Sequence, residues 1–274
     1  MDPKERSREI WDEMAPGWER QNELIWRASE PLARWMIDAL DPSPGQTILD
    51  IAAGPGDTGF LAAERGARLI STDFAAEMTA VAARAAKTRG LDNVECRQLD
   101  AEKMDLPDAS VDGVLCRWGF MLMQDPAAAL RECQRVLRTG GKLVFSVWGS
   151  PEANPWVTIP VVVAVDRGLT QPADARAPGG MFSMADESGV RAMLRDAKFQ
   201  RIELSTFPIT WGFDDFEALW SFYTELAGAV AALVKNAPSE TLAAFKDAVR
   251  AAADEYRTES GYTIPGEVLN GIAS

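Results

Sequence analysis

Between residues 46 and 148, short apolar runs rich in β-branched residues alternate with amphipathic helical stretches. The runs that predict strands are QTILDIAA, ARLISTD, NVECRQLD, VDGVLC and GKLVFSVW, and the stretches GFLAAER, AAEMTAVAARAAKTRG and PAAALRECQRVLR predict helices. Strands separated by helices of this length need crossover connections, so they lie parallel with helices on both faces. We therefore expect an α/β fold with a Rossmann-like, doubly wound, mainly parallel sheet of seven strands.

The flanking segments predict helical covers and one more strand. Residues 1–40 form two helical stretches, with a break expected at Pro16-Gly17. Apolar residues from Asp215 onward recur at spacings of three and four, as along one face of a helix, and Asn236 begins an interruption of that pattern. The expected divisions are a helical cap at 1–40, a core at 41–150, a lid segment with a core helix and strand at 151–213, a helical hairpin insertion at 214–260 and a last core strand at 261–274.

Charge and hydropathy argue against nucleic-acid and membrane partners. The 274 residues include 28 basic and 41 acidic side chains, a net charge of −13 that gives little attraction for phosphate backbones. The longest apolar stretch, Trp156 to Val165, is interrupted by Pro160 and is shorter than the roughly 20 residues of a membrane-spanning helix. Since the N-terminal segment also lacks an apolar signal-peptide region, we expect a cytoplasmic protein without membrane insertion.

The absence of histidine narrows the chemistry. Imidazole catalysis, histidine-dependent triads and histidine-bearing metal sites are excluded. The three cysteines, Cys96, Cys116 and Cys133, are widely spaced and contain no CxxC pair, so no bound metal is expected. Catalysis must rely on carboxylates, tyrosines, backbone groups or a cofactor, and no catalytic residue can be named from the sequence.

The glycine-rich turn after the first predicted strand is the most informative motif. Asp50 ends the strand, and Gly54, Gly56 and Gly59 follow it in the run ILDIAAGPGDTG. Missing side chains let backbone N–H groups approach a ligand at a helix N-terminus. Asp73 stands at the end of the second strand, where a carboxylate can accept both ribose hydroxyls of a nucleoside. The motif therefore predicts a nucleoside cofactor, although a purely structural turn remains an alternative.

Other carboxylates distinguish between possible cofactors. Asp100 and Ala101 follow the third strand, where a carboxylate and a backbone N–H can bind the edge of an adenine. Asp50 can pair with an ammonium group but would repel a pyrophosphate. A ligand that combines adenine, ribose and an amino acid therefore fits these charges better than a dinucleotide. A solvated acidic face is the alternative for the cluster that continues through Glu102 to Asp112.

These motifs resemble those of class I S-adenosylmethionine-dependent methyltransferases, in the small-molecule subgroup that includes the ubiquinone/menaquinone biosynthesis enzymes. The matching segments are LDIAAGPGDTG, STDFAAEM, QLDAEKMDLPDASVDGVLC and DPAAALRECQRVLRTGGKLVFSVW. The resemblance covers residues 46–148. It implies S-adenosyl-L-methionine as cofactor and S-adenosyl-L-homocysteine as product.

The resemblance also implies the residues that bind the cofactor. Asp50, Ala52, Gly54 and Gly56 would line its methionine end, and Asp73 would hold the ribose. The remaining expected contacts are Phe74 and Met78 beside the adenine, Asp100 and Ala101 on the adenine edge, and Cys116 and Arg117 near the sulfonium and carboxylate. One departure is Ala52, which stands where the family often has glycine. A small buried residue is the alternative interpretation of Cys116.

The acceptor is expected to be small and planar or hydrophobic, because aromatic residues follow the fourth strand and fill the segments outside the sheet. The candidate substrate-binding residues are Trp118, Phe120, Trp148, Trp156, Phe182 and Tyr223. Fastening of the cover to the core is the alternative role for these rings. We expect O-, N- or C-methylation by proximity and alignment, without a metal or a histidine base.

Two other functions remain open at this point. One is a catalytically silent module that binds the cofactor, and the other is an NAD(P)-dependent oxidoreductase. The expected partner is a small-molecule acceptor, and the chain is expected to be a monomer or a homodimer.

Overall fold

The computed structural model describes residues 2–226, 230–231, 233–234 and 237–274. Its centre is one mixed sheet with the strand order β3-β2-β1-β4-β5-β8-β6, and the short strand β7 pairs with β8 at its end. The strands are β1 (Thr47–Ile51), β2 (Arg68–Asp73), β3 (Val94–Gln98), β4 (Val111–Arg117), β5 (Leu137–Trp148), β6 (Ile202–Phe213), β7 (Arg257–Thr258) and β8 (Gly261–Ala273).

The first five strands are parallel, and β8 is antiparallel to its neighbours β5 and β6. The prediction of a Rossmann-like, doubly wound and mainly parallel sheet is therefore confirmed. Residues 261–273 lie beside residues 202–213 in one continuous ladder, and the segment between these two strands forms the helical insertion. The predicted division of the chain into domains stays a prediction.

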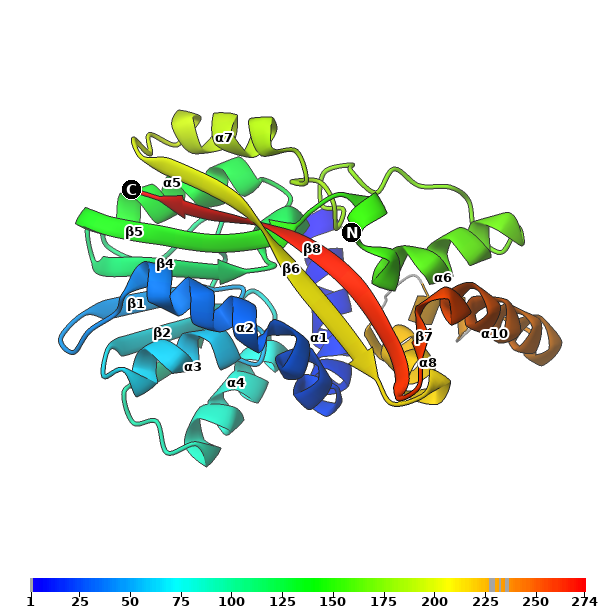
Figure 1. The fold of residues 1–274 in the computed structure, drawn as a ribbon. Coiled ribbons are helices and arrows are strands. Elements are labelled where there is room, and N and C mark those ends of the chain that lie inside the picture. The colour runs from blue at the N-terminus through cyan, green and yellow to red at the C-terminus, as the bar shows by residue number, and fades with distance from the viewer. Residues whose placement is uncertain (1, 227–229, 232, 235–236) are drawn as a thin grey trace.

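The helices cover both faces of the sheet (Figure 1). They are α1 (Pro3–Arg20), α2 (Asn22–Leu40), α3 (Asp57–Glu64), α4 (Ala76–Thr88), α5 (Pro126–Val136), α6 (Pro155–Asp166), α7 (Glu187–Asp196), α8 (Phe216–Leu226) and α10 (Ser239–Ala253), with 3₁₀ turns η1 (Phe120–Leu122), η2 (Pro151–Ala153) and η3 (Asp254–Tyr256). The connections β1-α3-β2 and β2-α4-β3 run in one direction along the sheet, and β4-α5-β5 runs in the other. Because such crossovers are right-handed, α5 packs on the opposite face from α3 and α4.

Two helical segments differ from expectation. Pro16 and Gly17 do not break the first helix, which continues to Arg20, and the boundary falls at Gln21. Gly17 has a packing reason instead: a Cβ atom there would lie 2.8 Å from the carbonyl oxygen of Glu225 in α8. The lid segment contains α6, a helix that was not predicted, with Pro160 inside it.

The helical insertion begins with α8 and ends with α10, which starts after Pro238. The predicted interruption at Asn236 lies outside the described residues. Among the described helices, none is both long enough and apolar enough to cross a bilayer.

The contact between β8 and β5 is tight at Gly271. A Cβ atom there would lie 2.2 Å from two ring carbons of the fully buried Phe145. We expect Gly271→Ala to lower the free energy of unfolding by about 1–3 kcal/mol, because the ring has no free space to enter. Gly212→Ala on β6 is the matched control, since a Cβ atom there has no neighbour within 4 Å. Urea unfolding of both variants tests this, and equal losses would contradict it.

Candidate functional site

The sheet changes its winding direction between β1 and β4, and ligands of doubly wound folds bind at the carboxyl ends of strands at such a point. A cavity of about 790 Å³ opens there. It is lined by residues that follow β1, β2, β3, β4 and β5, and it is covered by α1, α6, α8 and the segment around residues 175–182. One space therefore joins the predicted cofactor end to the predicted acceptor end.

Most of the predicted cofactor residues line this cavity: Ala52, Gly54, Asp73, Phe74, Met78, Asp100, Ala101 and Arg117. Asp50, Gly56 and Cys116 do not. Gly56 is the N-cap of α3, whereas Asp50 and Cys116 are buried in the layer beneath the cavity floor. The binding roles of all these residues stay predictions.

The glycine turn presents open backbone to the cavity. Gly54 lines the cavity with φ +55°, and a Cβ atom there would meet nothing within 4 Å. Ala52 adopts φ +50°, a left-handed conformation that costs a non-glycine residue roughly 1–2 kcal/mol. The glycine that the family often has at this position therefore matches the backbone conformation found here. The methyl group of Ala52 abuts Gly119, which shows how the turn accommodates it.

Asp73 is held so that its carboxylate faces the glycine turn. Its Oδ2 accepts a hydrogen bond from the backbone N–H of Gly54 at 2.9 Å, and its Oδ1 accepts one from the N–H of Ala75 at 2.9 Å. Each oxygen retains a further lone pair for a ligand hydroxyl. Burial raises the pKa of Asp73 despite these backbone donors.

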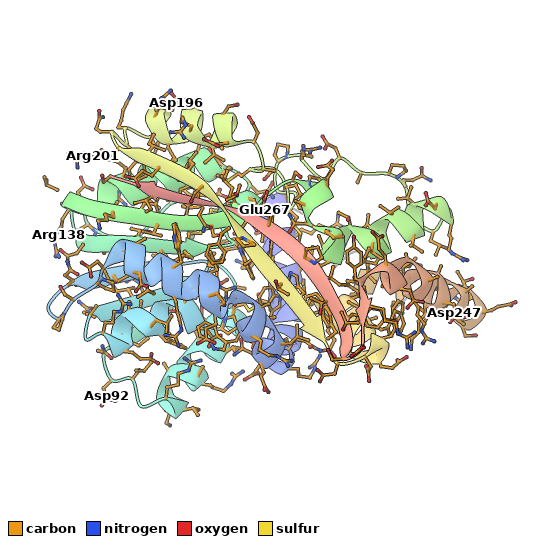
Figure 2. All side chains as sticks on the ribbon, viewed as in Figure 1. Asp92, Arg138, Asp196, Arg201, Asp247 and Glu267 are labelled. Carbon is orange, nitrogen blue, oxygen red and sulfur yellow. The ribbon has the colours of Figure 1, made fainter. Side chains whose placement is uncertain are left out.

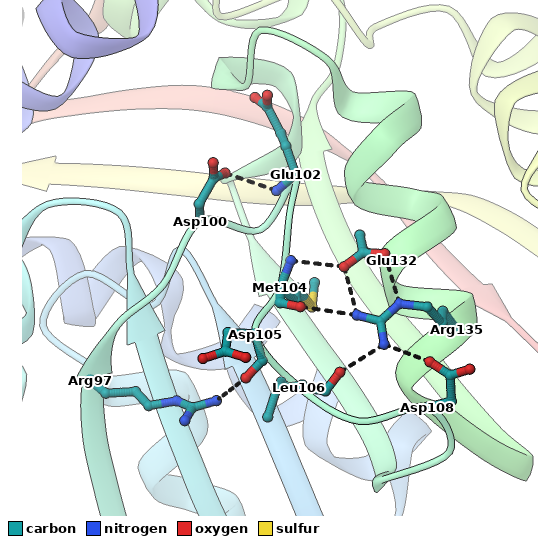
Figure 3. A network of polar contacts seen from close by, with 9 residues as sticks. All are labelled: Arg97, Asp100, Glu102, Met104, Asp105, Leu106, Asp108, Glu132 and Arg135. Carbon is teal, nitrogen blue, oxygen red and sulfur yellow. Dashed lines mark hydrogen bonds and ion pairs between the residues drawn. The ribbon is translucent and has the colours of Figure 1, made fainter.

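The loop after β3 is anchored from below by Arg135 of α5 (Figure 3). The Arg135 guanidinium donates to the carbonyl oxygens of Met104 and Leu106 and pairs with Glu132 and Asp108. These contacts fix the loop that carries Asp100. Within the acidic cluster, Asp105 and Asp108 are exposed as a solvated face would be, whereas the Glu102 side chain is only 12% exposed.

Asp50 is buried beside the cavity, and Arg117, which lines the cavity, is a positive charge that acts on it. Neither carboxylate oxygen of Asp50 has a hydrogen-bond partner among the described residues, and Arg117 Nη1 also lacks one. Gly59 leaves room for this carboxylate, because a Cβ atom there would lie 2.6 Å from Asp50 Oδ2. Burial raises the pKa of Asp50 to about 7, although the positive charge of Arg117 opposes the shift.

Arg117 connects the cofactor end of the cavity to the aromatic end. Its Nε donates to Thr58 Oγ1 at 2.8 Å, and its Cζ lies 4.5 Å from the centre of the Trp118 ring. Trp118 has φ +62°, a strained conformation for a bulky side chain that is typical of functional sites. Buried polar atoms without partners are uncommon in proteins, so the unpaired Nη1 of Arg117, which lines the cavity, fits an anionic group of a ligand.

Trp118 begins an aromatic cluster, which consists of Trp118, Trp148, Trp156, Trp211 and Phe222. Successive ring centres lie 4.4, 4.8, 4.7 and 5.0 Å apart. Every member of the cluster lines the cavity. These rings thus pack against one another and present one apolar surface to a ligand, so the two roles considered from the sequence are not exclusive.

Of the predicted substrate-binding residues, Trp118, Trp148, Trp156, Phe182 and Tyr223 line the cavity. Phe120 does not, because it is fully buried and packs edge-on against Phe145 at 5.6 Å. Burial raises the pKa of Tyr223 far above its ordinary value, so its hydroxyl stays protonated at neutral pH.

Several lining residues were missed by sequence reasoning. Lys4 contributes from α1, and Val157, Val161 and Val162 contribute from α6. A lysine in the first turn of a helix gives no signal that it faces a cavity, and α6 lacks the amphipathic pattern that would have predicted it. In the described part of the chain, no group of three or more Asp, Glu or Cys side chains could hold a metal ion.

Comparison with known proteins identifies the core. Residues 49–145 match a family model described as a methyltransferase domain. The demethylmenaquinone methyltransferase of Thermus thermophilus is 38% identical over 148 residues, which cover 52% of this chain and 66% of that protein. The ubiquinone/menaquinone biosynthesis C-methyltransferase UbiE of Hahella chejuensis is 34% identical over 155 residues, which cover 54% and 61%. The matched region thus spans less than two thirds of either relative.

Solved structures extend the similarity in fold over most of the chain. The YcgJ protein of Bacillus subtilis has a TM-score of 0.59 at 22% identity and covers 88% of this chain and 96% of its own. The [4+2]-cyclase SpnF has a TM-score of 0.56 at 18% identity and covers 90% and 82%. The sequence matches confirm the predicted resemblance to class I methyltransferases and S-adenosylmethionine as the cofactor of such a domain.

The raised pKa of Asp50 predicts a pH-dependent cost in stability. Since the folded-state pKa of about 7 lies above the ordinary value of 3.8, the contribution of Asp50 to stability is full below about pH 4 and is lost as the pH rises to about 7. The asparagine side chain does not titrate. We therefore expect the free energy of unfolding of Asp50→Asn, relative to wild type, to be about 2–3 kcal/mol higher at pH 8 than at pH 5. Urea unfolding at both pH values measures this. Asp92→Asn is the control, because Asp92, labelled in Figure 2, is exposed, precedes β3 and is not among the residues that line the cavity. The same gain in that variant would contradict the prediction.

Proposed function

With residues 49–145 as a class I S-adenosylmethionine-dependent methyltransferase domain, we propose that the chain transfers the methyl group of this cofactor to a small, planar or hydrophobic acceptor. The observation that supports this most directly is the single cavity of about 790 Å³, which lies within the range of small-molecule sites. One end carries the carboxylates suited to adenosine, and the other carries the aromatic cluster. Both ligands can therefore meet at Trp118.

The cofactor, when bound, supplies a methyl group on a positively charged sulfur, which leaves as a neutral thioether. The chain's own residues then have to orient two ligands and exclude water. Asp73 and the backbone of Gly54 would hold the ribose, and Asp100 and Ala101 would hold the adenine. Arg117, whose Nη1 is buried without a partner, would bind the carboxylate of the amino-acid part.

Among the residues that the structure describes, the acceptor end offers no strong base. The carboxylates that line the cavity are Asp73, Asp100 and Glu102, all at the cofactor end, and Tyr223 stays protonated. An acceptor that arrives already nucleophilic, such as a phenolate, an enolizable ring carbon, an amine or a thiol, fits this surface. The names of the two curated relatives make a demethylated quinol the first acceptor to test.

The edge of the cavity is also apolar. The large hydrophobic residues that are most exposed in the described structure are Ile10 of α1 and Val161 and Val162 of α6, at 44%, 41% and 52%, and all three line the cavity. Apolar residues at the surface often mark a binding site, and here they lie where the cavity opens. A hydrophobic acceptor could enter between α1 and α6.

A cofactor-binding protein without methyl transfer is the second candidate. The [4+2]-cyclase SpnF shares the fold, which shows that this architecture does not dictate one reaction. Transfer of labelled methyl groups to a panel of quinols, phenols, heterocyclic amines and thiols distinguishes the candidates. Binding of S-adenosylhomocysteine without any transfer would favour the second.

Asp73→Asn tests the cofactor end. An amide would place an N–H group against the backbone donors of Gly54 or Ala75 and would remove charge-assisted bonds to the ribose. We expect the dissociation constant for S-adenosylhomocysteine, measured by calorimetry, to rise about 10- to 100-fold.

Asp112→Asn is the matched control for that variant. Asp112 also accepts a backbone hydrogen bond, from Thr47, but it lies at the amino end of β4, where it pairs with Arg138, a residue labelled in Figure 2. Unchanged affinity in Asp73→Asn, or equal loss in both variants, would contradict the assignment.

Phe182→Ala tests the acceptor end. Phe182 is 4% exposed and lines the cavity, whereas Phe199 is equally buried but lies outside it. Both variants are expected to lose about 3–5 kcal/mol of stability. Only Phe182→Ala is expected to raise the KM for the acceptor, by about tenfold, with cofactor affinity preserved. Equal loss of cofactor and acceptor binding would instead indicate a packing role.

A further inference from the structure

The first turn of α1 carries a lysine that reaches the adenine end of the cavity. Lys4 Nζ lies 2.6 Å from Asp100 Oδ2 and 2.8 Å from Glu102 Oε2. It also lies 5.7 Å from the centre of the Phe74 ring. These three residues all line the cavity, as Lys4 does. The lysine is therefore placed directly over the predicted adenine site.

The carboxylates that Lys4 contacts belong to a fixed part of the protein. Figure 3 shows the carboxyl groups of Asp100 and Glu102 directed away from the Arg135 network that anchors their loop. Glu102 is held further, because its Oε1 accepts hydrogen bonds from the backbone N–H groups of Gln124 and Asp125. The movable partner in the contact is thus α1 rather than the loop.

The attachments of α1 are uneven along its length. Its last turns are held by Gly17 against α8, by the ion pair of Arg20 with Glu225 and by the hydrogen bond of Gln21 to Ser221. Its middle is held to α4 through Asp12, and its last turn is held to α4 through Glu19. Before Ala15, none of the described residues of α1 is fully buried. The first turns therefore form a part of the structure that can open locally.

We propose that Lys4 is a latch that holds the first turns of α1 closed over the adenine end of the cavity, so that breaking its two ion pairs controls how fast the cofactor exchanges. The proposal rests on the proposed function only in that adenosine occupies the end of the cavity between Asp73 and Asp100. Lys4 is a positioning residue, because it acts through α1 and through the two carboxylates.

Lys4→Ala tests the latch through both rates of S-adenosylhomocysteine exchange, followed by stopped-flow tryptophan fluorescence. Because a closed latch blocks entry as well as exit, we expect the association and dissociation rates to rise together, each about two- to tenfold, as expected from two partly exposed ion pairs. Added salt should speed exchange in wild type but not in Lys4→Ala, since screening weakens the same pairs. Lys4→Arg should restore slow exchange.

Lys103→Ala is the control, because it removes an equal charge from an exposed position next to Glu102 and outside the cavity lining. Equal rates in the Lys4→Ala and Lys103→Ala variants would overturn the proposal. A faster dissociation with unchanged association would also overturn it, because that is the result expected if Lys4 only contacted the bound ligand directly. Failure of wild type to bind S-adenosylhomocysteine would instead refute the proposed function.

Discussion

The handedness of the crossover connections is the constraint on which the site depends. Because β1, β2 and β3 wind in one direction and β4 and β5 in the other, the chain leaves β1 and β4 toward opposite faces of the sheet. The space between these two strand ends cannot be closed by either connection. The glycine turn, Asp73, the loop of Asp100 and the Arg117-Trp118 pair all meet there. The cavity is thus a consequence of topology before any side chain is chosen.

Within that space, the protein keeps charged groups that do not favour its own stability. A carboxylate without hydrogen bonds in the interior, such as Asp50, costs free energy, and the positive charge of the partly buried Arg117 offsets only part of it. Two further strained positions, Ala52 and Trp118, lie in the same small region. Backbone strain of this kind persists only where the surrounding structure enforces it, and it is typical of functional sites.

Sequence reasoning succeeded where the determining interactions are local. The five parallel strands, the glycine turn and the acidic strand ends follow from short-range periodicity and turn chemistry, and they recur in the structure as expected. It failed where distant segments decide. Gly17 is required by the approach of α8, more than 200 positions away in sequence, so its neighbour Pro16 looked like a helix break. The same limit applies to Lys4, whose partners Asp100 and Glu102 follow the third strand, the latter 98 positions away in sequence.

The two ends of the cavity are built from different parts of the fold. The cofactor end is built from strand termini and their first turns, so a change there disturbs the sheet itself. The acceptor end combines Trp148 of β5 and Trp211 of β6 with residues of the covering helices α6 and α8. The family match over residues 49–145 therefore includes Trp118 but none of the other four members of the aromatic cluster. Similarity over this segment bears on the cofactor end of the cavity and does not identify the acceptor.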